Sequence, residues 1–133
     1  MKYLLDTHII LWAMVNDKRL DSDIKNIIND SNNQIFYSTI STWEVELKHQ
    51  KFKNFSLTGE QFRFLCNQNY IENIQVKDKH VKKLAEFPKM FGKLEHKDPF
   101  DRMLLAQALD ENMILITHDK RFKQYKTKNL LFA

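Results

Sequence analysis

The sequence predicts an α/β protein, a three-layer α/β/α sandwich with a mainly parallel central sheet. Short apolar runs alternate along the chain with longer stretches in which apolar residues recur every three or four positions. This alternation is typical of parallel strands joined by crossover helices. The 133 residues include only two glycines and two prolines, so no linker or repeat divides the chain. We therefore expect one domain over residues 1–133, a length that suits a single hydrophobic core.

The first half of the chain contains two of the expected strands. Strands are expected at residues 2–5 and 34–37, and helices at residues 7–15, 22–29, 41–50 and 58–67. The strand segments are apolar runs too short to be helices, whereas the helical segments each have one apolar face. Helix 41–50 is expected to begin at a capping box, in which Ser41 and Glu44 would each satisfy a free backbone N–H group.

The second half of the chain continues the alternation. Strands are expected at residues 71–76, 113–116 and 130–132, and helices at residues 78–87, 99–112 and 120–125. Pro88 and Gly92 predict a loop that reaches Asp98, because both residue types interrupt regular structure. Asp98 followed by Pro99 is a typical helix start, with the aspartate as N-cap and proline at the first helical position.

Acidic residues occur where predicted strands meet the helices that follow them. They are Asp6, Glu44, Asp98, Asp101 and Asp119. In a parallel sheet the carboxyl ends of the strands and the amino ends of the following helices share one edge, which is where ligands bind. The helix that carries Asp101 precedes strand 113–116 and should run antiparallel to it, so Asp101 and Asp119 are expected at the same edge. We therefore expect these carboxylates to meet in space.

A cluster of carboxylates predicts a divalent cation. Like charges at short range repel, so such a cluster needs neutralisation, and oxygen ligands favour Mg²⁺ or Mn²⁺. Each acid also has an ordinary explanation, because Asp6, Asp98 and Asp119 suit helix N-caps and Asp101 suits the first turn of a helix. Capping and metal binding do not exclude one another, and for Asp98 the sequence leaves both roles open.

The charge of the chain favours a polyanionic partner. The net charge is +4, from 21 lysines and arginines against 17 acidic residues. The basic residues gather at residues 48–53, 77–83, 89–97 and 120–128. An acidic pocket with lysines around it suits a nucleic acid held through its phosphates, whereas the alternative is that these lysines only solvate helix faces.

Other features narrow the class of protein. No segment is apolar over the roughly 18 residues that a membrane span requires, and Asp6 and His8 interrupt the apolar N-terminal stretch, which argues against a signal peptide. Cys66 is the only cysteine, so it is expected in the core, an intrachain disulfide is excluded and a cytoplasmic location is expected. His96 and His118 lie beside the acids, and we expect them at the surface or in support of the site.

Four segments together resemble the PIN-domain family and, more narrowly, the VapC-type toxins of bacterial toxin–antitoxin systems. The segments are Leu4-Leu5-Asp6-Thr7-His8, then Ser41-Thr42-Trp43-Glu44 with Lys48, then His96-Lys97-Asp98-Pro99-Phe100-Asp101-Arg102 followed by Leu104-Leu105-Ala106-Gln107-Ala108, and last Thr117-His118-Asp119 with Phe122. Each segment alone is a weak signal. Their order and spacing, from residue 2 to the C-terminus, are specific.

The resemblance implies an endoribonuclease that depends on Mg²⁺ or Mn²⁺. Residues at the family's acidic, metal-binding positions are Asp6, Glu44, Asp101 and Asp119, and Thr117 stands at its hydroxyl position. Asp98 belongs to the motif of this subgroup. The resemblance also implies an RNA substrate, a homodimer and a small antitoxin protein that covers the active-site groove.

Three other functions remain open at this stage. Asp6 could accept a phosphoryl group as in receiver or haloacid-dehalogenase-like proteins, although the latter carry a second aspartate where this chain has His8. The domain could bind RNA or protein without cutting, or it could be a housekeeping RNA-processing nuclease.

Overall fold

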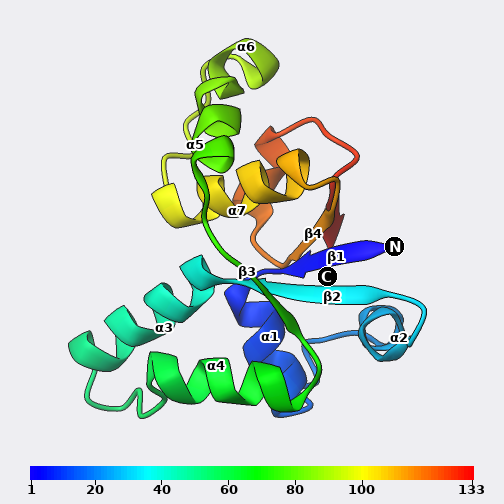
Figure 1. The fold of residues 1–133 in the computed structure, drawn as a ribbon, viewed down its shortest axis with the longest axis vertical. Helices are drawn as coiled ribbons and strands as arrows, with labels where there is room; N and C mark the ends of the chain where they lie inside the picture. The colour runs from blue at the N-terminus through cyan, green and yellow to red at the C-terminus, as the bar shows by residue number, and fades with distance from the viewer.

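The protein is a five-stranded sheet between two layers of helices (Figure 1), in a computed structural model that describes residues 1–133. The strands are β1 (Lys2–Leu5), β2 (Gln34–Ser38), β3 (Glu72–Ile74), β4 (Ile114–Thr117) and β5 (Leu130–Phe132). They lie in the order β3-β2-β1-β4-β5, and every neighbouring pair is parallel. The predicted α/β/α sandwich is confirmed, and the sheet is parallel throughout.

Alternate side chains of the strands feed two separate cores. In β1, Tyr3 and Leu5 belong to one core and Leu4 belongs to the other. The first core is covered by α1 (Thr7–Met14), α2 (Ser22–Asn29), α3 (Thr39–Lys51) and α4 (Gly59–Gln68), and the second by α5 (Asp78–Ala85), α6 (Phe87–Phe91) and α7 (Pro99–Asp110). Because both faces of the sheet are buried, its strands are continuous apolar runs in the sequence. Cys66 is buried in the first core, as expected.

The strand order places a switch point at the middle of the sheet. From β1 the chain moves outward to β2 and β3, then returns to pair β4 with the other side of β1. At such a reversal the connections after the two central strands leave in opposite directions, which opens a crevice at their carboxyl ends. In this protein the crevice lies beyond the ends of β1 and β4.

Helix α3 begins earlier than the sequence predicted. Its N-cap is Ser38, whose Oγ accepts a hydrogen bond from the backbone N–H of Ile40 at 3.0 Å. The predicted start at Ser41 and the capping box with Glu44 are therefore wrong. The reason is that β2 runs directly into the helix, so Ser41 is already buried inside it and its Oγ accepts a hydrogen bond from Thr7 Oγ1 at 2.8 Å.

The segment after α5 is the second correction. Residues 87–91 form the short helix α6, where a loop was predicted. Pro88 is tolerated because the first helical turn does not need its missing N–H group, and Gly92 ends the helix with a φ of 73°. The other differences are small: β3 is shorter than expected, and residues 120–124 form a 3-10 helix, η1 (Lys120–Gln124). None of the helices is long and apolar enough to cross a membrane.

Candidate metal centre at the carboxyl edge of the sheet

The five predicted acidic residues line one pocket at the switch point. The pocket has a volume of about 330 Å³, and the acids that line it are Asp6, Glu44, Asp98, Asp101 and Asp119. Basic and aromatic side chains complete its wall, namely His8, Trp12, Arg19, His118 and Arg121. Residues up to 113 positions apart in the chain thus contribute carboxylates to one small volume, as the strand-end rule predicted.

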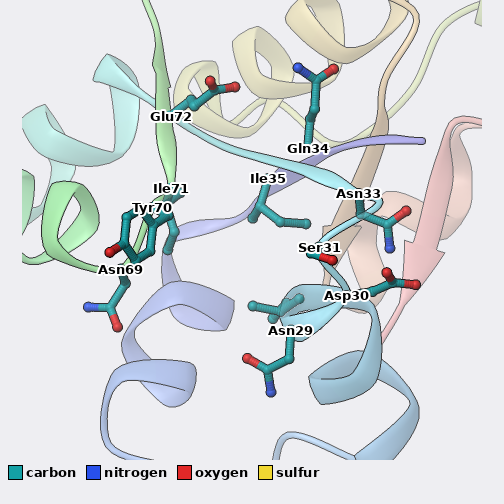
Figure 2. A pocket seen from close by; sticks show the side chains of 11 residues that line it. Asn29, Asp30, Ser31, Asn33, Gln34, Ile35, Asn69, Tyr70, Ile71 and Glu72 are labelled. Carbon is teal, nitrogen blue, oxygen red and sulfur yellow. The ribbon is translucent and has the colours of Figure 1, made fainter.

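A second hollow of about 440 Å³ lies elsewhere on the protein and contains none of these five acids. Figure 2 shows it beside the start of β2 and β3, with Gln34 and Ile35 on one side and Ile71 and Glu72 on the other. It is therefore at the amino ends of these strands, opposite to the edge where parallel sheets bind ligands. Although it is the larger hollow, it has no set of converging charged groups, and the acidic pocket is the better candidate site.

Asp6 is buried at the end of β1, with 6% of its surface exposed. Its Oδ1 accepts a hydrogen bond from the backbone N–H of Thr7 at 2.7 Å, and its Oδ2 accepts one from Thr117 Oγ1 at 2.7 Å. Burial raises the pKa of Asp6, and these two hydrogen bonds oppose that rise. Both oxygens are held in place, and each keeps a further lone pair for a cation.

Thr117, the last residue of β4, connects two of the acids. Its hydroxyl donates to Asp6 and accepts a hydrogen bond from the backbone N–H of Asp119 at 3.1 Å. The hydroxyl is buried, so both of its partners are fixed. The structure therefore brings this predicted site residue to the acids, where it orients them.

Asp101 lies in the first turn of α7 and is 7% exposed. Burial raises the pKa of Asp101 to about 8, and the negative charges of Asp6, Asp98 and Asp119 add to the rise. The surroundings of this carboxyl group therefore disfavour its negative charge, as expected where a cation is to bind.

The buried ring of His96 contacts Asp101. Its Nδ1 lies 3.0 Å from the hydroxyl oxygen of Tyr125, and its Nε2 lies 3.1 Å from Asp101 Oδ2, so both ring nitrogens have a hydrogen-bond partner. Burial lowers the pKa of His96, which keeps the ring neutral at pH 7. The expectation that His96 supports the site is confirmed, whereas Tyr125 was not predicted. Its position in the 120–125 segment, three residues after Phe122, carried no signal except that it is aromatic.

Asp98 and Glu44 complete the acidic wall. Asp98 caps α7, because its Oδ1 accepts hydrogen bonds from the backbone N–H groups of Phe100 at 2.9 Å and Asp101 at 3.2 Å. The predicted capping role is confirmed, and Asp98 also lines the pocket. Glu44 lines the pocket from α3.

Arg121 enters the acidic pocket and was missed by the sequence reasoning. Its Nε lies 3.1 and 3.0 Å from Oδ1 and Oδ2 of Asp119, and its Nη2 lies 2.6 Å from Oδ2. Nη2 also lies 3.5 Å from Asp101 Oδ2. The hydrogen bonds from Arg121 hold the pKa of Asp119 below its usual range. A possible signal was its position two residues after Asp119, inside the last basic cluster.

The donor set of the pocket fits a hard divalent cation. The five acids offer only oxygen ligands, and although His8 and His118 also line the pocket, no cysteine does. Such sets suit Mg²⁺ or Mn²⁺, whereas structural zinc sites use histidine and cysteine. Asp6, Glu44, Asp101 and Asp119 are the residues that could hold the ion.

A group outside the pocket, His80 with Asp110 and Glu111, has its ligand atoms within 4.8 Å of one another. Here the groups already satisfy each other. Nδ1 of His80 accepts from the N–H of Lys77 at 2.9 Å, Nε2 lies 2.7 Å from Glu111 Oε2, and Lys79 Nζ lies 2.8 Å from the same oxygen. This network ties α5 to the end of α7 and is explained without a metal ion.

The fold and the pocket define the class of this protein: a parallel α/β/α sandwich that gathers carboxylates at its switch point is a PIN-like domain. The family model of the PIN domain matches residues 3–128, and the chain belongs to that family. Members of the family are typically nucleases and generally depend on a metal ion.

Solved structures support the fold. VapBC2 from Rickettsia felis, bound to a promoter DNA fragment, has a TM-score of 0.71 at 23% identity and covers 100% of this chain and 98% of that chain. VapBC-1 from nontypeable Haemophilus influenzae has a TM-score of 0.69 at 21% identity and covers 100% of this chain and 97% of that one. DNA-bound VapBC from Salmonella typhimurium has a TM-score of 0.66 at 14% identity, with 99% and 98% covered. The curated proteins include no match.

Proposed function

We propose that this protein is a metal-dependent endoribonuclease and the toxin of a toxin–antitoxin pair. The observation that carries the proposal is the convergence of five carboxylates in one pocket, where burial and the neighbouring acids raise the pKa of Asp101. Asp6, Glu44, Asp101 and Asp119 would hold Mg²⁺ or Mn²⁺. When bound, the cation would activate water and stabilise the charge that builds on a phosphodiester during in-line displacement.

The chain's own residues prepare the pocket for this reaction. Thr117 and the N–H of Thr7 fix both oxygens of Asp6, and His96 fixes one oxygen of Asp101. Fixed carboxylates do not need to reorganise when a ligand binds, which is how enzymes lower the cost of developing charge. Either Glu44 or Asp119 could also accept a proton from water.

A groove beside the acidic pocket supports an RNA substrate. It has Glu44 and Asp98 in common with the pocket and continues over Leu47, Lys48, Gln50, Lys51, Phe52 and Phe100. Near its start, Trp43 is 54% exposed and packs edge-on against Phe100 with ring centroids 4.8 Å apart. Lysines beside exposed aromatic rings are typical of surfaces that hold single-stranded nucleic acid, since the lysines contact phosphates and the bases stack on the rings.

The other lysine clusters give weaker support. In the cluster at residues 77–83, Lys79 contacts Asp110 and Glu111, and Lys83 contacts Glu86. These ammonium groups already have anionic partners within the protein. Lys48 and Lys51 are therefore the better candidates for phosphate contacts.

The partner and location follow from the same proposal. The structural neighbours include VapBC complexes and a toxin–antitoxin complex from Klebsiella pneumoniae. By analogy, an antitoxin would cover the acidic pocket, two copies of this chain would pair, and the protein would meet RNA in the cytoplasm. A phosphoacceptor role for Asp6 is less favoured, since the residue is buried.

The test is RNA cleavage by the purified protein with Mn²⁺ and with EDTA. The wild type should cut, whereas Asp6→Asn and Asp101→Asn should lose nearly all activity with the fold intact. Asp23→Asn in α2 is the matched control, because Asp23 is exposed and outside the pocket. Near-full cleavage by either pocket variant at limiting metal would contradict the assignment. Sequencing RNA ends after brief expression in cells would then identify the RNA that is cut.

A further inference from the structure

We infer that Arg121 is a resident cation of the acidic pocket, which competes with a divalent metal ion for Asp119 and Asp101 and thereby sets the metal affinity of the protein. The inference rests on the proposed metal centre. Arg121 is not one of the four proposed metal ligands, but its side chain contacts two of them.

The contacts of Arg121 are all directed into the pocket. Its guanidinium group engages both oxygens of Asp119, with the shortest distance 2.6 Å, and reaches Asp101 Oδ2 at 3.5 Å. Even its backbone N–H donates to Asp119, at 2.9 Å. A two-point contact between guanidinium and carboxylate is stronger and better oriented than a single ion pair. The guanidinium group therefore occupies the oxygens that a metal ion would use.

The other arginine at the rim behaves differently. Arg19 forms two side-chain hydrogen bonds with Asp17, at 3.1 and 2.7 Å, and lies over the ring of Trp12 at 4.7 Å from its centroid. Asp17 does not line the pocket. Of the two rim arginines, only Arg121 is paired with the proposed metal ligands.

Arg121 is placed so that it can leave. Its side chain is 57% exposed, and it extends from the short 3-10 helix η1 at the surface. Water can solvate the exposed guanidinium group once it leaves the acids, so a divalent ion can displace the arginine without unfolding anything. Its backbone stays two residues from Asp119, so the displaced guanidinium group remains within reach of a phosphate bound in the pocket.

The experiment is calorimetric titration of the metal-free full-length protein with Mn²⁺, in the absence of RNA. Arg121→Gln should bind Mn²⁺ about 3- to 10-fold more tightly than the wild type, as expected when an exposed ion pair no longer competes. Arg121→Lys should fall between the two, since an ammonium group keeps the charge but loses the two-point contact. Lys120→Gln is the matched control for loss of one positive charge, because Lys120 is exposed and does not line the pocket.

A second readout is the rise in melting temperature on adding Mn²⁺, which should be larger for Arg121→Gln than for the wild type. If Arg121→Gln does not fold, Arg121→Lys alone decides, and it must bind Mn²⁺ more tightly than the wild type. Equal or weaker Mn²⁺ binding by the arginine variants, or an equal gain in Lys120→Gln, overturns the inference and leaves the metal centre intact. If the wild type and all variants fail to bind Mn²⁺, the proposed metal centre fails as well.

Discussion

The hydroxyl group of Thr117 donates a hydrogen bond to Oδ2 of Asp6 at 2.7 Å, although the two residues are 111 positions apart in the chain. Because β1 and β4 are neighbours in the sheet, their ends bring the two side chains together. The same hydroxyl accepts the backbone N–H of Asp119. One side chain therefore sets the position of a carboxylate on each side of the switch point.

Removing this hydroxyl should weaken metal binding. In Thr117→Val, Asp6 loses a hydrogen bond that lowers its pKa and fixes one of its oxygens, and the turn before Asp119 is no longer fixed. A hydrogen bond to a charged group contributes about 1.5–3 kcal/mol, so Mn²⁺ affinity should fall about tenfold or more. Titration calorimetry measures this. Thr117→Ser keeps the hydroxyl and should remain close to the wild type, and an equal loss in both variants would count against the hydrogen bond as the cause.

The pKa of Asp101 predicts a pH-dependent stability of the metal-free protein. The pKa is about 8 in the folded state against an ordinary value of 3.8, so between these values the folded protein binds more protons than the unfolded chain. The free energy of unfolding should therefore decrease as pH rises from about 4 to about 8. Asp101→Asn removes this charge, so in EDTA it should be more stable than the wild type at pH 8.5 and gain less at pH 5.

Urea unfolding at the two pH values, with and without Mn²⁺, measures this effect. Adding Mn²⁺ should stabilise the wild type at pH 8.5 and have little effect on Asp101→Asn, because the ion compensates the charge that the variant lacks. A wild type that is more stable than Asp101→Asn at pH 8.5 in EDTA would show that other groups already neutralise Asp101.

The acidic residues show most clearly how much of the site could be predicted from the sequence alone. A parallel sheet has one carboxyl edge, so the position of Asp6 or Asp119 after a strand was enough to place it in three dimensions. The start of α3 failed because Ser41 and Glu44 satisfy a local capping pattern, whereas the actual cap, Ser38, follows from β2 entering the helix without a loop. Ser38 and Ser41 are both suitable N-cap residues, so the local sequence pattern does not distinguish the two helix starts.

The contacts around the acids could not be predicted from the sequence, for a different reason. Several basic residues follow Asp119, and which of them turns back toward the pocket depends on the 3-10 geometry of η1. The pair of Trp43 and Phe100 comes from two helices, α3 and α7, that meet only in the folded protein. Side-chain direction at such places is set by tertiary packing and has no periodic signal.

The groove beside the pocket predicts a specific change in salt dependence. RNA affinity should fall linearly on a plot of log K against log salt concentration, with a slope of roughly −0.7 per phosphate contact on a single strand. The double variant Lys48→Gln with Lys51→Gln should therefore lower the magnitude of the slope by about 1.4. The control is Lys79→Gln with Lys83→Gln, whose ammonium groups already contact acids of the protein. If the magnitude of the slope decreased more in the control than in the groove variant, the RNA would bind on a different face.

Expression of the gene without any partner should arrest bacterial growth if the protein is a toxin. The physical basis is the acidic pocket, which would hold the ion needed for RNA cleavage and in which Arg121 is paired with Asp119 and Asp101. A partner that inserts an arginine or lysine would replace the charge of the ion and block the substrate at once. Wild type and Asp6→Asn would be induced side by side, with Asp23→Asn as a control that should also arrest growth. Equal growth of all three strains, with the wild-type protein abundant and folded, would exclude the toxin role and leave the nuclease proposal to the cleavage assay.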